Sequence, residues 1–316
     1  MINLSASNLT NISQAITNIT MDDEALNVPL KVSYIITIIF NSITCPFIVV
    51  LNVLVIMAVK RKPRLQSYAN VLLACLAVTD ALTGLLVQPT FITWGIFQLL
   101  GGINTDIVRP LHFFFLTVVT FSSALHLMLV TCERLIAIKY TMAYPYLVTA
   151  RNIKVAVTSS WVLALCCSVL RWPLPNLLFN ERLGRLIGKM IVSIVLISCI
   201  VFMTTSYTIL YKEAAHQQSK IKAQQLPQEE VERFVKERKA LKTTVYVIGA
   251  VLLCLSPGAL SFVPVIAEQD TTYLAPWFRM IVMLNSLLNP LIYCWRQKEM
   301  RQFVFRMSSP AVTAVN

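Results

Sequence analysis

Charged residues are scarce in this chain. They make up 13% of its 316 residues, whereas hydrophobic residues make up 56%. Soluble domains carry about 25% charged residues, so a water-soluble protein of this length could not cover its surface with so few charges. Most of the chain must therefore face lipid or other helices, as in one membrane-embedded domain rather than two soluble ones.

Charge is absent or nearly absent from seven long stretches. A helix needs about 20 residues to cross about 30 Å of hydrocarbon, and all but the fourth meet that length. The fourth has 16 residues before Arg171 and is long enough if residues 172–179 extend it. Alternation of period two, which marks a membrane β-barrel, is lacking, so we expect an all-α bundle of seven transmembrane helices. The stretches are 33–59, 68–95, 110–132, 155–170, 190–211, 243–267 and 271–295.

Basic residues are unevenly divided between the two sides of these stretches. Of the 27 lysines and arginines, 20 fall in the loops and tail of one side. An excess of positive charge marks the cytoplasmic side, so seven spans leave the N-terminus outside the cell. The net charge is +12, but the basic residues are spread over alternate loops rather than gathered in a single patch. This distribution argues against nucleic-acid binding. We expect a multi-pass protein of the plasma membrane, surrounded by membrane lipid.

Aromatic residues are lacking in the first 32 residues. This polar segment predicts a disordered extracellular tail. It has no apolar signal-peptide core, so the first span is expected to direct insertion. Four N-glycosylation sequons agree with an extracellular position. Their asparagines are Asn3, Asn8, Asn11 and Asn18.

No cysteine lies in a predicted outer loop, where an oxidising compartment would permit a disulfide. All eight cysteines fall within spans or at a span end, where they are expected to act as small apolar residues. We therefore expect no disulfide. Cysteines and histidines also lack the spacing of metal ligands, so we expect no cofactor held by them.

Polar residues and prolines inside the spans form motifs. The seventh span ends in Asn289-Pro290-Leu291-Ile292-Tyr293, and the third ends in Glu133-Arg134-Leu135. These segments resemble the Asn-Pro-x-x-Tyr and acidic-Arg-Tyr motifs of rhodopsin-like (class A) G-protein-coupled receptors. The resemblance covers about residues 33–307. Landmark positions of that family are occupied, in the right order, by Asn52, Leu76, Ala77, Asp80, Trp161, Tyr207 and Pro257.

The resemblance implies three regions and a function. Residues 1–32 would form the glycosylated extracellular tail, and 33–295 the seven-transmembrane receptor domain. Residues 296–316 would form a cytoplasmic amphipathic helix and a short tail. Such receptors bind an extracellular small-molecule or peptide ligand and activate heterotrimeric G proteins.

Asp80 is the only acidic residue well inside any span. A charged side chain at mid-membrane costs roughly 2.5–3.5 kcal/mol on insertion scales, so Asp80 should have polar partners. The resemblance implies that the cluster binds an allosteric sodium ion, the one bound ion we expect. A structural polar knot between helices is the alternative. The predicted cluster consists of Asn52, Asp80, Ser123, Asn285, Ser286 and Asn289.

A second set of residues lies at the inner ends of the spans. The resemblance implies that Arg134 pairs with Glu133 and Glu237 at rest and is released on activation. Tyr207 and Tyr293 would then hold it in the active arrangement. The alternative is an arginine whose side chain extends to the lipid headgroups.

The chain departs from the family pattern at several positions. Arg109 stands where the family's outer disulfide begins, and no cysteine follows between spans four and five. With Cys199 in place of a proline in span five, these features resemble the branch of melanocortin, lysophospholipid, cannabinoid and adenosine receptors. Leu255 and Val251 replace an aromatic pair of the sixth span. An atypical receptor that binds ligand but couples poorly is therefore the main alternative.

Three other classes of membrane protein lack their marks here. The inverted repeat and the charges in several spans that are expected of a transporter are absent. No nucleophile and base are paired at membrane depth, so we expect no enzyme. A retinal-binding opsin needs a lysine in the seventh span, where the only basic residue is Arg279.

The residues expected around the ligand favour an anion. Leu116 occupies the position where amine receptors of the family carry an aspartate, so a buried ammonium would have no partner. Arg279 faces the pocket if span seven follows family geometry, and extension outward to the headgroups is the alternative. We expect an anionic amphiphile, with a peptide as the alternative. The pocket would be formed by His112, Phe113, Leu116, Thr120, Phe121 and Arg279, with Arg171, Arg182, Arg185 and Lys189 at its entrance.

Overall fold

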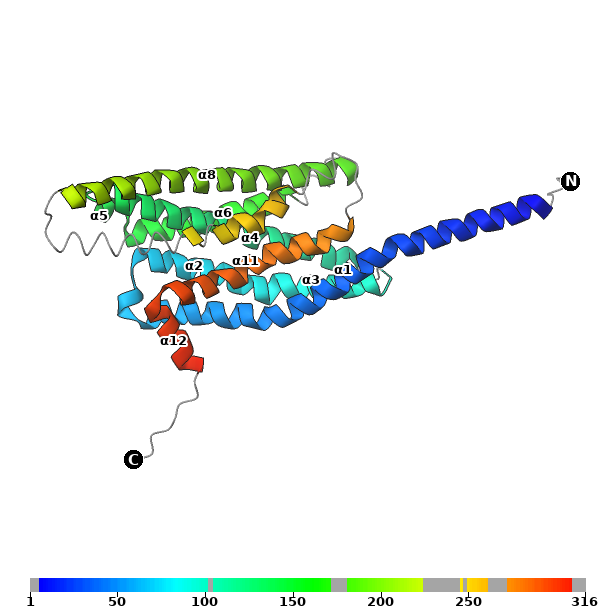
Figure 1. Cartoon of the computed structure of the whole chain (residues 1–316), viewed down its shortest axis with the longest axis horizontal. Helices are drawn as coiled ribbons and strands as arrows, with labels where there is room; N and C mark the ends of the chain where they lie inside the picture. Colours follow the sequence, from blue (N-terminus) through cyan, green and yellow to red (C-terminus); the bar gives the residue numbers. More distant parts are fainter. Residues whose placement is uncertain are drawn as a thin grey trace, which may run out of the picture.

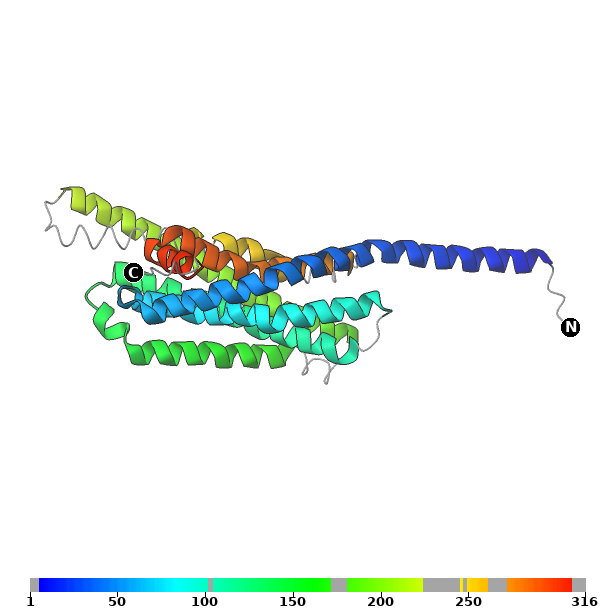
Figure 2. The ribbon, with the colours of Figure 1, turned by 90° about the horizontal axis from the view of Figure 1, so that it is seen from below.

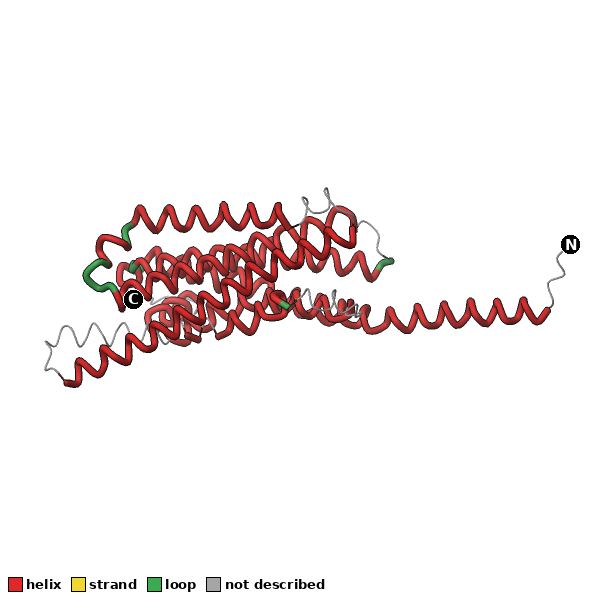
Figure 3. The backbone as a smooth tube through the Cα atoms, turned by 90° about the horizontal axis from the view of Figure 1, so that it is seen from above, coloured by secondary structure: helices red, strands yellow, loops and turns green. Residues whose placement is uncertain are grey.

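The structure, a computed structural model, describes residues 6–101, 105–171, 181–223, 245–246, 249–260 and 272–308. The regular elements among these residues are all helical, and the long helices lie side by side in an elongated bundle (Figure 1). Figure 3 shows helix along nearly the whole described backbone, interrupted by short turns. The predicted all-α bundle is therefore confirmed.

The first helix is longer than the sequence predicts. α1 runs from Ala6 to Arg61, and its N-terminal part projects beyond the bundle (Figures 1 and 2). The expected disordered tail is thus helical from Ala6 onward. The segment 6–28 contains neither glycine nor proline, the two residues that most oppose helix formation, so no residue interrupts the helix before Pro29.

The second span is one helical segment with an irregular turn in its middle. α2 (Tyr68–Leu82) begins after Ser67, whose side chain accepts a hydrogen bond from the backbone N–H of Asn70. It continues through a π-turn, η2 (Thr83–Val87), into α3 (Gln88–Leu99). The turn precedes Pro89. Proline has no backbone N–H to donate, and its ring pushes against the previous turn, so a wider local winding relieves the conflict.

α4 (Thr105–Lys139) is the central helix of the bundle. It packs against α2 and α3 and against α6 (Ala150–Arg171) and α8 (Glu181–Ala223). α6 reaches membrane length in a way that the sequence did not predict, because it begins at Ala150 rather than at residue 155. The hydroxyl of Thr149 accepts the N–H of Asn152 and stabilises this start. The predicted extension over 172–179 lies outside the described residues.

The C-terminal part begins with η3 (Thr272–Leu274) and α11 (Ala275–Arg296). The amphipathic helix α12 (Lys298–Ser308) follows and lies against α1 and α11, at the end of the bundle opposite to the projecting start of α1 (Figure 1). Its apolar side buries Met300, Phe303 and Val304. Two short helices, η1 (Pro63–Leu65) and α5 (Tyr144–Leu147), lie in turns between the long ones.

Five helical segments within the described residues are long and apolar enough to span a membrane. The sixth predicted span is described only in part, as an apolar helix over Gly249–Ala259. α11 corresponds to the seventh span, and its asparagines and Arg279 lower its hydropathy. The outer faces carry exposed apolar side chains such as Ile43 and Ile194, as expected where helices face lipid. The five segments are Val28–Arg61, Tyr68–Leu99, Thr105–Lys139, Ala150–Arg171 and Leu186–His216.

Candidate functional site

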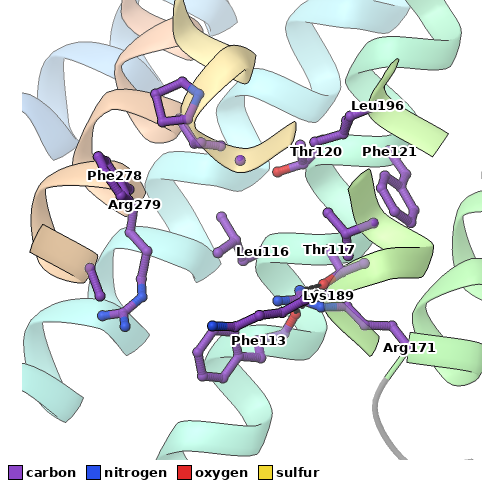
Figure 4. A pocket seen from close by; sticks show the side chains of 15 residues that line it. Phe113, Leu116, Thr117, Thr120, Phe121, Arg171, Lys189, Leu196, Phe278 and Arg279 are labelled. Carbon is purple, nitrogen blue, oxygen red and sulfur yellow. Dashed lines mark hydrogen bonds between the residues drawn. The ribbon is translucent and has the colours of Figure 1, made fainter. Parts of the chain in front are cut away.

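A cavity of about 180 Å³ lies between α4, α6, α8, α11 and the described part of the sixth span. Its walls are mainly apolar, with three basic side chains and no carboxylate among the lining residues that the structure describes (Figure 4). Five of the six residues predicted for the pocket line it: Phe113, Leu116, Thr120, Phe121 and Arg279. Sequence analysis missed several others, including Thr117, Val192, Leu196, Phe278 and Val282.

His112, the sixth predicted residue, does not line the cavity. Its side chain is fully buried, and Nδ1 lies 3.2 Å from Oγ1 of Thr90. Its ring centroid lies 5.6 Å from those of Phe91 and Trp94. Neighbouring residues on a helix point in directions about 100° apart, so His112 faces α3 while Phe113 faces the cavity.

Arg279 approaches the cavity from α11. Its guanidinium carbon lies 4.3 Å from the ring centroid of Trp94 and 5.5 Å from that of Phe113, which are cation–π distances. Its Nη1 is buried without a hydrogen-bond partner among the described residues, and the Tyr34 side chain interacts with the group. The side chain therefore points into the bundle, which excludes the alternative that it extends outward to the headgroups.

Arg171, the last residue of α6, approaches Phe113 from the other side. Its Nη1 donates to Oγ1 of Thr117 and, at 3.4 Å, to the carbonyl oxygen of Phe113. Its guanidinium carbon lies 5.2 Å from the Phe113 ring centroid. Lys189 on α8 lies beside Arg171 in Figure 4. Both residues were predicted at the entrance of the pocket, but in the structure both line the wall of the cavity. The Arg171 side chain extends across to α4. The side chains of the other two predicted entrance residues, Arg182 and Arg185, lie outside the described set.

Arg171 and Arg279 share Phe113. Both guanidinium carbons lie within cation–π distance of one ring, so their separation is at most the sum of those two distances. Within the described residues, neither of these two arginines forms an ion pair with a carboxylate. Two like charges roughly 10 Å apart repel by about 1.7 kcal/mol at an effective dielectric constant of about 20. An anion between them would remove this repulsion and accept charge-assisted hydrogen bonds. The site is therefore suited to an anionic group next to an apolar surface.

The predicted polar cluster forms around Asp80, whose side chain is fully buried. Nδ2 of Asn289 donates to Oδ2 of Asp80 at 2.8 Å. Nδ2 of Asn52 donates to the carbonyl oxygen of Ser286 at 3.0 Å, and the hydroxyl of Ser286 donates to Oγ1 of Thr83 at 2.9 Å. Residues of three spans thus meet at one buried carboxylate. Ser123 and Asn285 also line a small cavity with Ser286, and this cavity shares Leu116 and Thr120 with the larger one.

Several oxygen atoms of this cluster are buried without a hydrogen-bond partner among the described residues. A buried acceptor that lacks a partner costs about 1–3 kcal/mol. A set of oxygen donors that includes one carboxylate is the ligand type preferred by hard cations, so the residues fit a sodium ion. The atoms are Oδ1 of Asn52, Asp80, Asn285 and Asn289, and Oγ of Ser123.

Glu133 and Arg134 form a buried ion pair on α4. Nε of Arg134 lies 2.5 Å from Oε2 of Glu133, and Nη2 lies 2.9 Å from Oε1. The hydroxyl of Tyr144, on α5, donates to the same Oε1 at 2.7 Å. Sequence analysis missed Tyr144, because a four-residue helix in a turn leaves no periodic signal in the sequence.

The other residues predicted for the coupling switch are placed less completely. Tyr293 is fully buried in the main apolar core. Tyr207 packs between that core and a smaller cluster formed by Ile138, Leu210 and Ala214. Glu237 lies outside the described residues.

Comparisons with known proteins agree with these features. A family model described as 7 transmembrane receptor (rhodopsin family) matches residues 51–293. The adenosine receptor A2a of Cavia porcellus is 26% identical over 284 residues, which cover 79% of this chain and 67% of that receptor. The histamine H2 receptor of Rattus norvegicus is 27% identical over 281 residues, covering 79% and 73%. The sphingosine 1-phosphate receptor 2 of Homo sapiens is 27% identical over 288 residues, covering 84% and 74%.

The family match includes Asp80, the Glu133–Arg134 pair and the Asn289–Tyr293 motif, and it extends over well more than half of the sequence. The chain therefore belongs to the rhodopsin family of seven-transmembrane, G-protein-coupled receptors.

Proposed function

We propose that this G-protein-coupled receptor is activated by an extracellular anionic amphiphile, a ligand with a negatively charged head and an apolar tail. The observation that carries the proposal is the charge of the cavity. Arg171, Lys189 and Arg279 line it, and none of the lining residues that the structure describes is acidic. A cationic amine would add a further positive charge without meeting a carboxylate, whereas an anion would compensate charges already present.

The apolar walls support the tail of such a ligand. Phe121 and Leu196 line the cavity away from the three cations, with Leu116 between the two regions in Figure 4. Each methylene group of a ligand that is buried against such walls contributes about 0.8 kcal/mol to binding. A charged head without a tail would leave this apolar surface uncovered.

The names of the relatives cover different ligand chemistries. Adenosine is a neutral nucleoside, histamine is an amine, and sphingosine 1-phosphate is a phosphorylated amphiphile. Of these three, the last matches a cavity that combines basic side chains with apolar walls. The relatives therefore support the proposal at the level of ligand class and do not identify the ligand.

In the proposed arrangement the N-terminus faces the outside and the Glu133–Arg134 pair faces the cytoplasm. The excess of basic residues on one side and the four sequons support this orientation. Heterotrimeric G proteins would bind at the inner end, after Arg134 is released. A sodium ion at Asp80 would hold the resting arrangement. The oxygen atoms around that carboxylate that lack a partner within the described part of the chain support this role.

A panel of fatty acids, lysophospholipids, amines and peptides tests the ligand class. Each compound is applied to cells that express the parent or Arg279→Ala, and second messengers are measured at equal surface expression. We expect an anionic amphiphile to activate the parent and to lose at least about tenfold in potency on Arg279→Ala. Activation by an amine, or by an anion that is indifferent to Arg279, would contradict the proposal.

A receptor that binds ligand but couples weakly is a second candidate, favoured by the sixth span. Leu255 and Val251 are both buried in the main core, where the family has larger aromatic side chains. Measuring binding and G-protein activation in the same cells separates the two candidates. Saturable binding without activation of any G-protein class would favour the weakly coupling receptor.

A further inference from the structure

The arrangement of Arg171 and Arg279 around Phe113 favours a more specific class of ligand. This inference rests on the proposed function. We propose that the head group of the ligand carries two negative charges and binds both arginines at once across the ring of Phe113. Figure 4 shows Arg279 on one side of this ring and Arg171 on the other.

Both guanidinium groups lie beside the same aromatic ring. They lie 5.2 Å and 5.5 Å from the same ring centroid. The two side chains come from α6 and α11, which are distant in the sequence. A phosphate or a pair of carboxylates has oxygen atoms on more than one side, so it can accept from two guanidinium groups that approach from different directions.

Both arginines keep donors for a ligand. Within the described residues Arg171 forms hydrogen bonds only through Nη1, to Thr117 and to the backbone of Phe113. These two bonds hold the guanidinium over the cavity and leave its other N–H groups for an acceptor. Nη1 of Arg279 is buried and has no hydrogen-bond partner among the residues that the structure describes. Thr117 is therefore a positioning residue, while Arg171 and Arg279 would contact the head group.

Charge balance separates a dianion from a monoanion. Arg171 and Arg279 both line the cavity, so a monoanion compensates one of these two charges and leaves the other beside apolar walls. Uncompensated charge away from water is unfavourable, so a second negative charge on the ligand should add affinity. A phosphate monoester carries about −1.5 to −2 charges at pH 7 and has three acceptor oxygens. An alkyl malonate supplies two charges through two carboxylates. The two share the chemistry of a compact dianionic head.

Matched pairs of ligands test the second charge directly. Decyl phosphate is compared with its monomethyl ester, and decylmalonic acid with its monomethyl ester, on the full-length receptor in cells. Each pair keeps the tail and changes the head from a dianion to a monoanion. We expect about tenfold or greater loss of potency within at least one pair. The pair that shows the loss identifies phosphate or dicarboxylate as the source of the two charges.

Variants test whether the two arginines act together. If one head bridges both, Arg171→Gln and Arg279→Gln should each reduce the dianion-to-monoanion potency ratio to about one, and the double variant should reduce it no further. Arg171→Lys and Arg279→Lys keep the charge and should keep part of the ratio. Lys31→Gln, on the exposed outer part of α1, is the matched control and should change nothing. Surface expression is measured for each variant.

The outcomes distinguish this inference from the proposed function. If both members of each pair are equally potent and both still depend on Arg279, the anionic ligand stands and the bridging dianion is refuted. If the ratio on the parent is large but survives loss of Arg171, the bridge is also refuted. If no anionic amphiphile activates the parent, the proposed function fails, and this inference fails with it.

Discussion

The carboxylate of Glu133 accepts hydrogen bonds from two different elements, Arg134 on α4 and Tyr144 on α5. Both carboxylate oxygens are used, and the side chain is almost fully buried. Removal of one donor would leave the ion pair intact but less constrained. Tyr144 therefore acts on Arg134 through Glu133, and it links the turn after α4 to the pair that the family resemblance connects with signalling.

Replacement of Tyr144 by phenylalanine should raise basal signalling. A hydrogen bond to a charged group contributes roughly 1.5–3 kcal/mol, and partial exposure reduces this, so we expect a rise of a few-fold at most. Basal second-messenger levels at equal surface expression measure the effect. Tyr146→Phe, in the same short helix but highly exposed, is the matched control. Equal basal levels in both variants would show that the Tyr144 bond does not restrain the pair.

Replacement of Asp80 by asparagine should abolish the dependence of agonist affinity on sodium. The change keeps the shape of the side chain and removes the charge that would hold the cation among the unpaired oxygen atoms. Coupling between two sites is typically about 5–150-fold, so the parent should lose at least about fivefold in agonist affinity when sodium replaces potassium. Asp106→Asn, an exposed carboxylate, serves as control. A sodium response unchanged by Asp80→Asn would leave the cluster as a structural polar knot.

Some site residues could be predicted from the sequence, and others could not. The cluster around Asp80 was predictable, because a carboxylate inside an apolar span requires polar partners from neighbouring helices. The position of the Arg171 and Lys189 side chains in the cavity wall was not predictable, because it depends on the direction in which a long side chain turns at a helix end. His112 was misplaced for a related reason. One residue of helical rotation decides between the cavity and α3, and hydropathy does not determine that rotation.

At the scale of elements, close contact between α1 and the second span stands out. Gly84, in the π-turn η2, has no side chain where Val49 and the backbone of Cys45 approach. A Cβ atom at this position would lie 2.7 Å from Cγ2 of Val49 and 3.1 Å from the carbonyl oxygen of Cys45. The thiol of Cys45 also donates to the carbonyl oxygen of Gly84 at 3.1 Å. The irregular turn and the missing side chain together allow the two helices to touch.

Gly84→Ala should therefore destabilise the receptor. Extra atoms in a closely packed contact cost about 1–3 kcal/mol, and here one of the opposing atoms belongs to the backbone, which cannot rotate away. We expect a lower thermal unfolding temperature in detergent. Gly249→Ala, where an added Cβ would meet no atom of the described residues within 4 Å, should leave this temperature unchanged or raise it. Equal stability of both variants would contradict the close contact.

The existence of the spans was predictable from the sequence, and their ends were not. Long uncharged runs predict helices, because backbone polar groups without a hydrogen-bond partner are costly in lipid. The starts of α1 and α6 differ from the predictions because polar residues continue a helix whenever no glycine or proline interrupts it. The π-turn before Pro89 could not be predicted either, because hydropathy does not detect local changes in the winding of a helix.

At the scale of the whole molecule, the orientation proposed from charge has a direct consequence. The sequons at Asn3, Asn8, Asn11 and Asn18 lie on the N-terminal side of the first span. If this side is extracellular, glycosidase treatment should lower the apparent mass of the receptor on gels. A variant with all four asparagines changed to glutamine should show no such shift. If the parent protein is insensitive to the enzyme, or if antibodies reach the tail only after the cells are permeabilised, the proposed orientation is wrong.

α4 contributes to the cavity, to the polar cluster around Asp80 and to the Glu133–Arg134 ion pair. Phe113 and Thr117 lie at the cavity, Ser123 at the polar cluster, and Glu133 and Arg134 near the C-terminal end, all on one helix from Thr105 to Lys139. At 1.5 Å per residue such a helix is about 50 Å long, enough to cross the hydrocarbon core of a bilayer. In genetic terms, this segment should tolerate the fewest substitutions. A saturation screen would find fewer neutral variants per position there than in α6, whose described buried side chains are few and small.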